Sequence, residues 1–550
     1  MQTQKLPGWG SGALVGALLT ISLVAISFLG HQAVGLPFVG FDFFDWLGRT
    51  LDGRVVTFGI DMIVGVIRSL NLGPTATTAK LAEQIMGVGA IIGLGAGAGV
   101  LFFALAPRVK TLRQDILGIG LGIAAGALML LISLSLNRPS TLSPLVIIVW
   151  TLLLFTAWGL AHGWVYRDMT NAGTIVHSDG KVEVEVLDRR QFLIRLGGAT
   201  ATITAIGAGL GGLLGQRAAS SVPVNTVAGE AQTPGAGDRW SAANALPNAD
   251  AEIEAAPGTR PELSSLEDHY RIDINSVPPV VDGTTWTLPI TGLVETPLNL
   301  TMADIQAYEP LHRFVTLSCI SNGIGGDLIS TQRWTGASLK RVLEAARPTE
   351  DAAYLRISGA DGFFEYVSLE MINADERIML TYYWDGVPLE IEHGYPLRIY
   401  IPDLYGMKQP KWITSIEVVD AWDEGFWVVR GWDEVARVNT TSVIDAVAAN
   451  SSYERDGTTY VPIGGIAYAG ARSISRVEVR VNDGEWQEAR LRTPLSDTTW
   501  VIWRYDWAFA SGEHTFEVRA VDGDGAAQRE ESRPVRPSGA TGVHRVRRTL

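Results

Sequence analysis

Long apolar runs in the first part of the chain give way to short alternating runs in the second part. Four segments before residue 216 are long and apolar enough to cross a bilayer: residues 12–29, 85–106, 116–136 and 145–166. A fifth segment, residues 196–215, is less hydrophobic and rich in Gly, Ala and Thr. The pattern therefore predicts an N-terminal transmembrane α-helical region with about five spans.

Two further segments of this region need a different interpretation. Residues 55–70 are apolar but interrupted by Asp61 and Arg68, and a charge inside the membrane is costly. We expect this segment to be an amphipathic helix on the outer membrane face. The glycine-rich run 93–99 imitates a nucleotide-binding loop, but it lies inside an apolar span and not after a strand. Close packing between helices is therefore the favoured interpretation.

The second part of the chain changes pattern twice. Short β runs and helical stretches first alternate, which is typical of an α+β domain, and strands then dominate. Val477, Val479 and Val481 alternate with polar residues before the turn Asn482-Asp483-Gly484, a pattern typical of a β-hairpin. We expect a C-terminal immunoglobulin-like β-sandwich. The predicted boundaries are 1–187 (membrane domain with four spans), 188–215 (fifth span), 216–262 (linker), 263–434 (α+β domain), 435–537 (sandwich) and 538–550 (tail).

Positive charges predict the orientation of the spans. With the N-terminus cytoplasmic, the basic residues after the second span (Arg108, Lys110 and Arg113) and after the fourth span also lie inside, as the positive-inside rule requires. The fifth span follows Asp188-Arg189-Arg190-Gln191-Phe192-Leu193, which resembles a twin-arginine export signal. An isolated Arg-Arg pair is usually a positive membrane flank, but the Phe-Leu pair and the weakly apolar stretch favour export. We therefore expect a multi-pass protein of the cell membrane, with the later domains on the extracytoplasmic side.

Charge and composition exclude some functions. A formal net charge of −14 argues against an electrostatic nucleic-acid binder, because such a protein needs a clustered basic face. His31 and His162 would lie on opposite membrane faces, so they cannot ligate one haem, and we predict no haem. The membrane region is thus expected to be an anchor in the lipid bilayer or a docking surface, and not a path for electrons.

Cys319 is the only cysteine among 550 residues. A lone cysteine cannot form an internal disulfide. It is therefore either a buried small hydrophobe or a thiolate kept for nucleophilic or soft-metal chemistry. Its neighbours in the sequence decide between these alternatives.

Several ordered motifs surround Cys319. They are Trp286-Thr287-Leu288-Pro289-Ile290-Thr291-Gly292, Cys319-Ile320-Ser321-Asn322, Arg333-Trp334-Thr335-Gly336, His393-Gly394-Tyr395-Pro396-Leu397-Arg398 and Gly406-Met407-Lys408-Gln409-Pro410-Lys411-Trp412. In this order and at these separations, the region from about residue 270 to about residue 522 resembles the sulfite oxidase family of molybdenum-pterin oxidoreductases. This family includes the periplasmic methionine-sulfoxide reductases.

The resemblance implies a molybdenum–molybdopterin cofactor and assigns its contacts. Molybdenum is soft enough to take a thiolate, so Cys319 is the expected metal ligand, and the cofactor supplies two further sulfurs. Arg398 and Lys411 suit the phosphate of the pterin. The full set of cofactor-binding positions implied by the family is Tyr270, Arg271, Cys319, Asp361, His393, Arg398, Gln409, Pro410 and Lys411. In the resembling family, the immunoglobulin-like domain after the cofactor domain often mediates dimerisation, which predicts a homodimer.

Trp432 is a departure from the family that bears on the substrate. Sulfite oxidases keep a tyrosine near the metal, and a count without gaps from Lys411 puts Trp432 there. A second sulfite-contacting arginine would fall near Asp273. The loss of a phenol and a cation weakens a pocket that oxidises an anion. Reduction of a neutral oxide such as a sulfoxide therefore becomes comparable with sulfite oxidation, and the expected catalytic residues are Cys319, Arg398 and Trp432.

These inferences predict a membrane-anchored molybdopterin oxidoreductase that carries out two-electron oxygen-atom transfer. Its partners would be a small-molecule substrate and an electron donor or acceptor that the sequence does not identify. The alternative is a non-enzymatic membrane scaffold with a vestigial cofactor domain. Retention of Cys319, Arg398 and Lys411 together argues against the scaffold.

Overall fold

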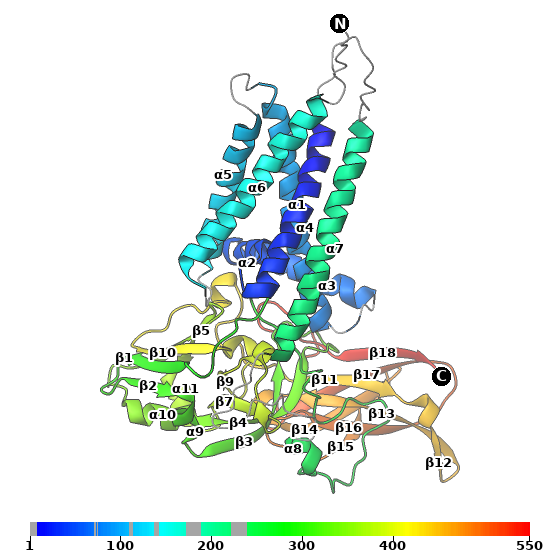
Figure 1. The fold of residues 1–550 in the computed structure, drawn as a ribbon. Helices are drawn as coiled ribbons and strands as arrows, with labels where there is room; N and C mark the ends of the chain where they lie inside the picture. The colour runs from blue at the N-terminus through cyan, green and yellow to red at the C-terminus, as the bar shows by residue number, and fades with distance from the viewer. Residues whose placement is uncertain are drawn as a thin grey trace, which may run out of the picture. The chain divides into compact units, whose positions relative to one another are not determined.

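The computed structural model divides the chain into two compact units (Figure 1). It describes residues 8–70, 73, 75–108, 114–136, 142–171, 189–221 and 239–550. The first unit comprises Met1–Leu51, Ala79–Val222 and Ile274–Val277, and the second comprises Asp52–Thr78, Pro223–Asp273 and Pro278–Leu550. Lys110 and Arg113, expected on the inner face, and Asp188, before the Arg-Arg pair, lie outside the described residues.

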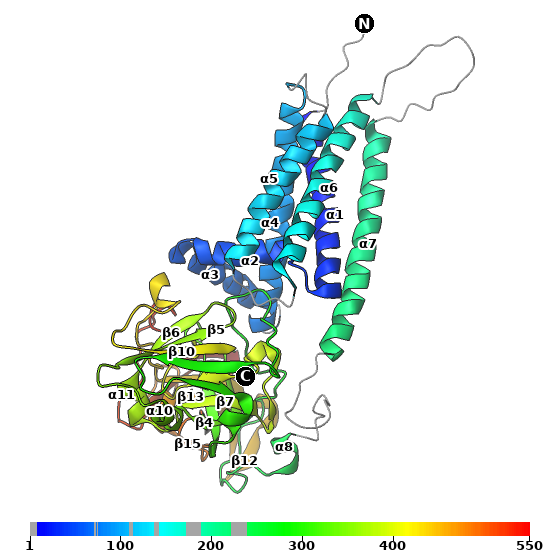
Figure 2. The ribbon, with the colours of Figure 1, turned by 60° about the vertical axis from the view of Figure 1, so that its left-hand side comes forward.

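The first unit is a bundle of long apolar helices that run alongside one another, with the shorter helix Val39–Thr50 lying across them (Figures 1 and 2). Its helices are α1 (Trp9–Val34), α2 (Val39–Thr50), α4 (Thr75–Leu105), α5 (Gln114–Ser135), α6 (Pro144–Asn171) and α7 (Arg189–Ser221). Five of the described helices, namely α1, α4, α5, α6 and α7, are long and apolar enough to cross a membrane. This finding confirms the predicted number of spans and is compatible with a multi-pass membrane protein.

Glycines bring helices α1 and α4 into backbone contact. A Cβ atom added at Gly16 would overlap the backbone of Gly95, and one added at Gly99 would overlap the backbone of Gly12. Gly93 faces open space. The packing role predicted for the glycine run is therefore confirmed for the glycines that face α1.

Helix α3 (Gly53–Ser69) forms where the sequence predicts an amphipathic helix, and it is grouped with the second unit. Val55, Phe58, Met62 and Val66 are exposed and recur at helical spacing, so they form one apolar stripe. The helix and its amphipathic character are thus confirmed. Its contact with lipid stays a prediction.

The middle of the chain, in the second unit, folds as an α+β domain with two sheets. One sheet has the order β2-β1-β10-β5-β6, and the other has the order β3-β4-β7-β8 with β9 paired to β7. The strands are β1 (Thr287–Gly292), β2 (Leu298–Thr301), β3 (Pro310–Ser318), β4 (Ile329–Ser338), β5 (Tyr354–Gly359), β6 (Phe364–Ser368), β7 (Met379–Trp384), β8 (Val387–Pro388), β9 (Arg398–Tyr400) and β10 (Ile413–Val419). The helices are α9 (Met302–Gln306), α10 (Leu339–Ala346) and α11 (Leu369–Ala374). Helix α10 places Leu339, Val342 and Leu343 in the main hydrophobic core of this domain.

The C-terminal part is an all-β region of eight antiparallel strands. These are β11 (Thr441–Val447), β12 (Tyr453–Arg455), β13 (Thr458–Tyr468), β14 (Ile474–Val481), β15 (Gln487–Leu491), β16 (Val501–Ala508), β17 (Glu513–Asp522) and β18 (His544–Thr549). Their order is β11-β13-β16-β15-β14-β17-β18, and β12 pairs with β13. Asn482 and Asp483 both have a positive φ, as expected of the predicted hairpin turn between β14 and β15. The predicted turn is therefore confirmed.

Two segments lie differently from the predicted boundaries. The region 538–550 contains β18, which pairs with β17, because its Val546 packs against the buried core of this region. Part of the predicted linker, residues 239–262, lies on the later domains. It includes α8 (Trp240–Ala243), Ser241 Oγ donates to Asp385 Oδ2 at 2.7 Å, and Arg492 donates to the backbone carbonyl of Ile253 at 2.7 Å. The polar composition of residues 239–262 predicted a linker and gave no sign of these long-range hydrogen bonds.

Candidate functional site

Cys319 lies directly after β3, in the turn that leads to β4. Its backbone N–H donates to Leu328 O at 3.0 Å, and its carbonyl accepts from Asn322 N at 3.0 Å. Its Sγ lies 2.9 Å from the hydroxyl of Ser321, and the residue is 7% exposed. Burial raises the pKa of the Cys319 thiol, while the hydrogen bond with Ser321 lowers it. The two backbone hydrogen bonds to Leu328 and Asn322 hold the chain on both sides of the thiol.

Arg398 opens strand β9 and is buried. Its guanidinium lies over the ring of Trp334, 4.6 Å from the centroid, and its Nη1 donates to His393 O at 3.1 Å. Its Nε has no hydrogen-bond partner. Burial lowers the pKa of Arg398 to about 10. A buried guanidinium with a free N–H can bind an anion that the protein does not itself supply.

Lys411 and Arg271 add two more cations to Arg398. Lys411 Nζ lies 3.5 Å from Asp273 Oδ2 and donates to Glu392 O at 3.1 Å. Arg271 Nε donates to Asp273 Oδ2 at 2.8 Å, and its Nη2 has no hydrogen-bond partner. Burial lowers the pKa of Lys411 to about 8; Asp273 opposes this shift and Arg398 reinforces it. Arg271 also lowers the pKa of Lys411, so an added anion would stabilise the charged form of this lysine.

Gly394 lets two of these cations approach each other. Its φ is +111°, and a Cβ atom there would lie 3.1 Å from the Cβ atoms of Arg398 and Lys411. A larger residue would therefore be strained and crowded at this position. The closeness of Arg398 and Lys411 to this position explains why the motif has a glycine at residue 394.

Two uncharged histidines complete the buried surroundings. His269 and His393 lie with ring centroids 5.2 Å apart, and both contact the ring of Trp384. Burial lowers the pKa of His269 to about 3, and the charge of Arg398 acts in the same direction. Burial and the nearby charges also hold the pKa of His393 well below its ordinary value. Both rings are therefore neutral near pH 7, and the positive charge resides on the arginines and the lysine.

Tyr270 links the cysteine to the cationic cluster. It shares a hydrophobic cluster with Cys319 and Trp334, and its ring stacks on that of His269 at 5.7 Å. Burial raises the pKa of Tyr270 well above its ordinary value; Cys319 adds to this shift and Arg398 opposes it. One largely buried region therefore brings together these predicted residues: Tyr270, Arg271, Cys319, His393, Arg398 and Lys411.

Three other predicted cofactor contacts have different surroundings. Gln409 Nε2 donates to the backbone carbonyls of Ile401 and Leu404, at 3.1 and 2.9 Å, so this amide braces its own loop. Pro410 accepts from Ile399 N at 3.2 Å through its carbonyl. Asp361 lies in the turn between β5 and β6, where its Oδ1 accepts from Phe363 N at 3.0 Å. Asp361 also raises the pKa of Lys411, which places it near the cations.

Trp432 lies in a neighbouring hydrophobic cluster, together with Ile320 and Tyr405. Its indole Nε1 is buried and has no hydrogen-bond partner. Ile320 follows Cys319 directly, so Trp432 is connected to the cysteine turn through this cluster and not through the cations. Burial raises the pKa of Tyr405 to about 12, and Cys319 contributes to the shift.

The structure adds His269 and Tyr405, which sequence reasoning did not single out, and gives Asp273 a role as a partner of the cations. All three surround the predicted site but lie just outside the motifs used to find it. His269 and Asp273 flank the predicted pair Tyr270-Arg271, and Tyr405 precedes the Gly406 motif. Proximity to a motif was the only sequence signal for His269 and Tyr405.

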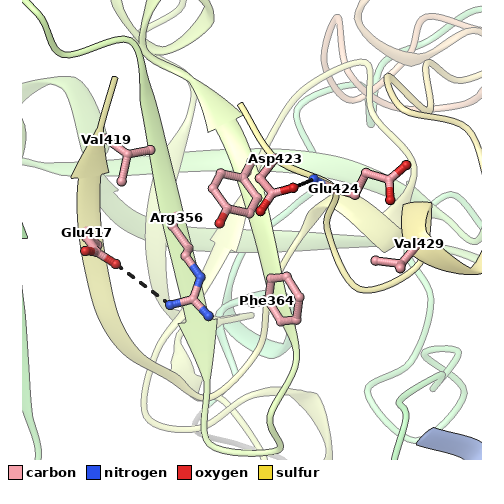
Figure 3. A pocket seen from close by; sticks show the side chains of 8 residues that line it. Arg356, Phe364, Glu417, Val419, Asp423, Glu424 and Val429 are labelled. Atoms are coloured by element: carbon pink, nitrogen blue, oxygen red, sulfur yellow. Dashed lines mark hydrogen bonds and ion pairs between the residues drawn. The ribbon is translucent and has the colours of Figure 1, made fainter. Parts of the chain in front are cut away.

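A surface pocket of about 600 Å³ lies elsewhere on the α+β domain (Figure 3). It is lined by Arg356, Phe364, Tyr366, Glu417, Val419, Asp423, Glu424 and Val429. Arg356 reaches toward Glu417, at 3.8 Å, and lies over the ring of Phe364. None of these lining residues belongs to the cluster of Arg271, Arg398 and Lys411, so the pocket is separate from the candidate site.

The buried region fits a phosphate-bearing cofactor with a thiolate-bound metal. Unpaired donors on Arg271 and Arg398, with Lys411 beside them, suit a phosphate. Among the described residues, no group of three or more His, Cys, Asp or Glu side chains could hold a metal ion. A metal at Cys319 would therefore need further ligands from the cofactor, which matches a dithiolene group.

Comparisons with known proteins agree with this geometry. Residues 274–427 match the model of the oxidoreductase molybdopterin binding domain. The uncharacterized oxidoreductase YuiH of Bacillus subtilis is 31% identical over 156 residues, which are 28% of this chain and 76% of YuiH. Sulfite oxidase of Arabidopsis thaliana is 24% identical over 337 residues, which are 52% of this chain and 86% of that enzyme.

Nitrate reductase [NADPH] of Fusarium oxysporum is 28% identical over 285 residues, which are 43% of this chain. The match spans 31% of the length of that relative. The similarity is therefore longer than the cofactor-binding region, but it leaves most of the larger reductase unmatched. With the family model, the relatives and the buried cationic site in agreement, the chain belongs to the sulfite-oxidase-like family of molybdopterin-dependent oxidoreductases.

Proposed function

We propose that the protein is a membrane-anchored oxidoreductase whose cofactor domain lies on the extracytoplasmic side, and that it transfers an oxygen atom to or from a small substrate, a sulfoxide or sulfite. The observation that carries this proposal is the cluster of the buried Arg398 and the partly exposed Arg271 and Lys411 beside a single thiol. We further propose that the C-terminal β region is an immunoglobulin-like, dimer-forming domain. The five apolar helices support the anchor.

The residues of the chain would divide the work of holding the cofactor. Arg271, Arg398 and Lys411 would bind the phosphate, and Cys319 would be the protein ligand of molybdenum. The bound cofactor supplies the two-electron oxygen-atom transfer. The rings of His269 and His393 pack against Trp384, and Arg398 is buried beside them, which strengthens the attraction of its guanidinium for an anion.

Substrate preference should respond to Trp432. Trp432→Tyr would introduce the phenol that sulfite oxidases have, and a hydrogen bond to a charged substrate contributes about 1.5–3 kcal/mol. We therefore expect sulfite oxidation to rise about tenfold relative to sulfoxide reduction. Steady-state assays of both proteins with sulfite, with a methyl sulfoxide and with nitrate, the substrate named in one group of relatives, would measure this ratio.

Trp427→Tyr is the matched control, because Trp427 lies beside Trp432 at a centroid distance of 6.4 Å and contacts the same cluster. This variant should leave the ratio unchanged. A wild-type protein that already oxidises sulfite rapidly would contradict the role given to Trp432. A wild-type protein inactive on every substrate, although it contains molybdenum, would contradict the proposed substrate class.

The side of the membrane should depend on Arg189 and Arg190, which begin helix α7. Replacing both by lysine keeps the charge that the positive-inside rule counts, but it removes the guanidinium groups that a twin-arginine receptor reads. We expect the double variant to keep the cofactor domain in the cytoplasm. Protease added outside intact spheroplasts should then cleave this domain in the wild type only.

Replacement of Arg167 and Arg195 by lysine is the matched control for a general effect of lysine at this end of the helices. Both arginines belong to the basic residues expected inside but lie outside the Arg-Arg pair. If the Arg189→Lys/Arg190→Lys protein were cleaved from outside like the wild type, ordinary insertion would account for the orientation.

A further inference from the structure

Strand β3, which leads into Cys319, is an edge strand of its sheet. Its register pairs it with β4 alone, from Pro310 opposite Ala337 to Ser318 opposite Ile329. In an antiparallel pair, alternate residues point their N–H and C=O groups away from the partner strand. The outward groups of Phe314 and Thr316 therefore need partners from elsewhere.

The C-terminal β region supplies these partners. Thr316 N donates to Thr498 O at 3.0 Å, and Tyr468 Oη donates to Thr316 O at 2.7 Å. The carbonyl of Phe314 accepts from Ser496 Oγ at 2.6 Å and from Thr498 Oγ1 at 3.0 Å. The backbone groups of β3 that make these bonds all lie within five residues of Cys319 in the sequence.

The side chain of Thr316 extends the same network inward. Trp500 N donates to Thr316 Oγ1 at 2.9 Å, and Thr316 Oγ1 also bonds the hydroxyl of Thr331 on β4. Thr316, Tyr468 and Trp500 are buried. Loss of the Tyr468 hydroxyl would leave the buried carbonyl of Thr316 without its donor. Water could replace this donor only if the edge of β3 opened locally.

A second set of contacts reaches the far side of the cysteine turn. Ile320, directly after Cys319, packs in one hydrophobic cluster with Tyr468, Trp500 and Ile502 of the C-terminal region. Tyr405, whose phenol is near enough to Cys319 for the thiol to raise its pKa, accepts from Asn439 N at 3.1 Å. The C-terminal region therefore holds both the strand before Cys319 and the residues packed beyond it.

We propose that the C-terminal β region positions the thiol of Cys319, with Tyr468 and the pair Ser496 and Thr498 as the positioning residues. The region is thus part of the cofactor site, besides any role in dimerisation. The proposal rests on the function proposed for Cys319. Its test, however, reads the thiol in the full chain without cofactor, so it can fail independently of that function.

The test uses Cys319 as its own probe, because it is the only cysteine in the chain. Full-length protein produced without the cofactor is treated with iodoacetamide in detergent at fixed pH, and the rate of alkylation is followed by mass spectrometry. Tyr468→Phe removes the hydroxyl that donates to Thr316 O. Without this hydrogen bond, the edge strand β3 should open locally more often. We expect alkylation about tenfold faster than in the wild type.

Two controls separate positioning from general destabilisation. Tyr453→Phe makes the same chemical change on β12, where the ring stacks on Tyr460, and it should not change the rate. Val479→Ala, in the separate core of the C-terminal strands, should lower the Tm without changing the rate. Equal acceleration by Val479→Ala would show that the thiol is exposed by global unfolding and would overturn the proposal.

A second route to the same edge covers the case in which Tyr468→Phe does not fold. The double variant Ser496→Ala/Thr498→Val removes both side-chain donors to Phe314 O while it leaves Tyr468 in place. It should also accelerate alkylation. If a folded variant of either kind is alkylated at the wild-type rate, the C-terminal region does not position the thiol.

Discussion

Cys319→Ser is expected to abolish turnover and leave the protein folded. A hydroxyl is a harder and poorer ligand for molybdenum than a thiolate, so the metal loses its only proposed protein ligand. The exchange of sulfur for oxygen is small, and the turn is held by backbone hydrogen bonds to Leu328 and Asn322, which remain. Steady-state oxygen-atom transfer, measured beside thermal unfolding of the same preparation, would test this.

Molybdenum content distinguishes the reasons for a loss of activity in this variant. If Cys319→Ser keeps its molybdenum but loses turnover, the thiolate is needed for the reactivity of the metal. If Cys319→Ser loses its molybdenum, the thiolate also anchors the metal. Ser321→Ala is a useful companion, because it removes the hydroxyl at 2.9 Å from Sγ but keeps the thiol, and it should retain turnover. Full activity in Cys319→Ser would remove Cys319 from the mechanism.

Arg398→Met should deprive the protein of its cofactor. The wild type should contain about one molybdenum per chain, because the chain has one cysteine to serve as the metal ligand. Removal of the guanidinium eliminates at least one charge-assisted hydrogen bond to the phosphate, each contributing about 1.5–3 kcal/mol. Cofactor affinity should therefore fall at least about tenfold. Elemental analysis after gel filtration of protein made in a cofactor-competent host would measure the loss.

Matched variants show whether the position or the charge matters. Arg356→Met makes the same change on β5, where the arginine faces Glu417 at the surface pocket, and it should keep its molybdenum (Figure 3). Arg398→Lys keeps a positive charge but loses the planar guanidinium that lies over Trp334. We therefore expect a molybdenum content between those of the wild type and Arg398→Met. A wild type without molybdenum, made in a competent host, would contradict the cofactor assignment.

Local patterns in the sequence were sufficient for several features. The five apolar helices follow from the length of apolar runs, because a span depends only on its own side chains and the bilayer. The hairpin at Asn482-Asp483-Gly484 follows from residues that tolerate a positive φ. The region around Cys319, Arg398 and Lys411 was found because its motifs occur in a recognisable order. The immunoglobulin-like assignment and the dimer stay predictions.

The tertiary structure alone decided which groups meet. Thr316 and Thr498 are separated by 182 positions, and no local pattern relates them, yet they complete the edge of β3. Gln409 lies in the predicted cofactor motif, but its amide braces residues 401–404. His269 and Asp273 join the site although no motif contains them. Hydrophobic periodicity reports what a segment buries and not what it is buried against, so such long-range contacts appear only when the chain has folded.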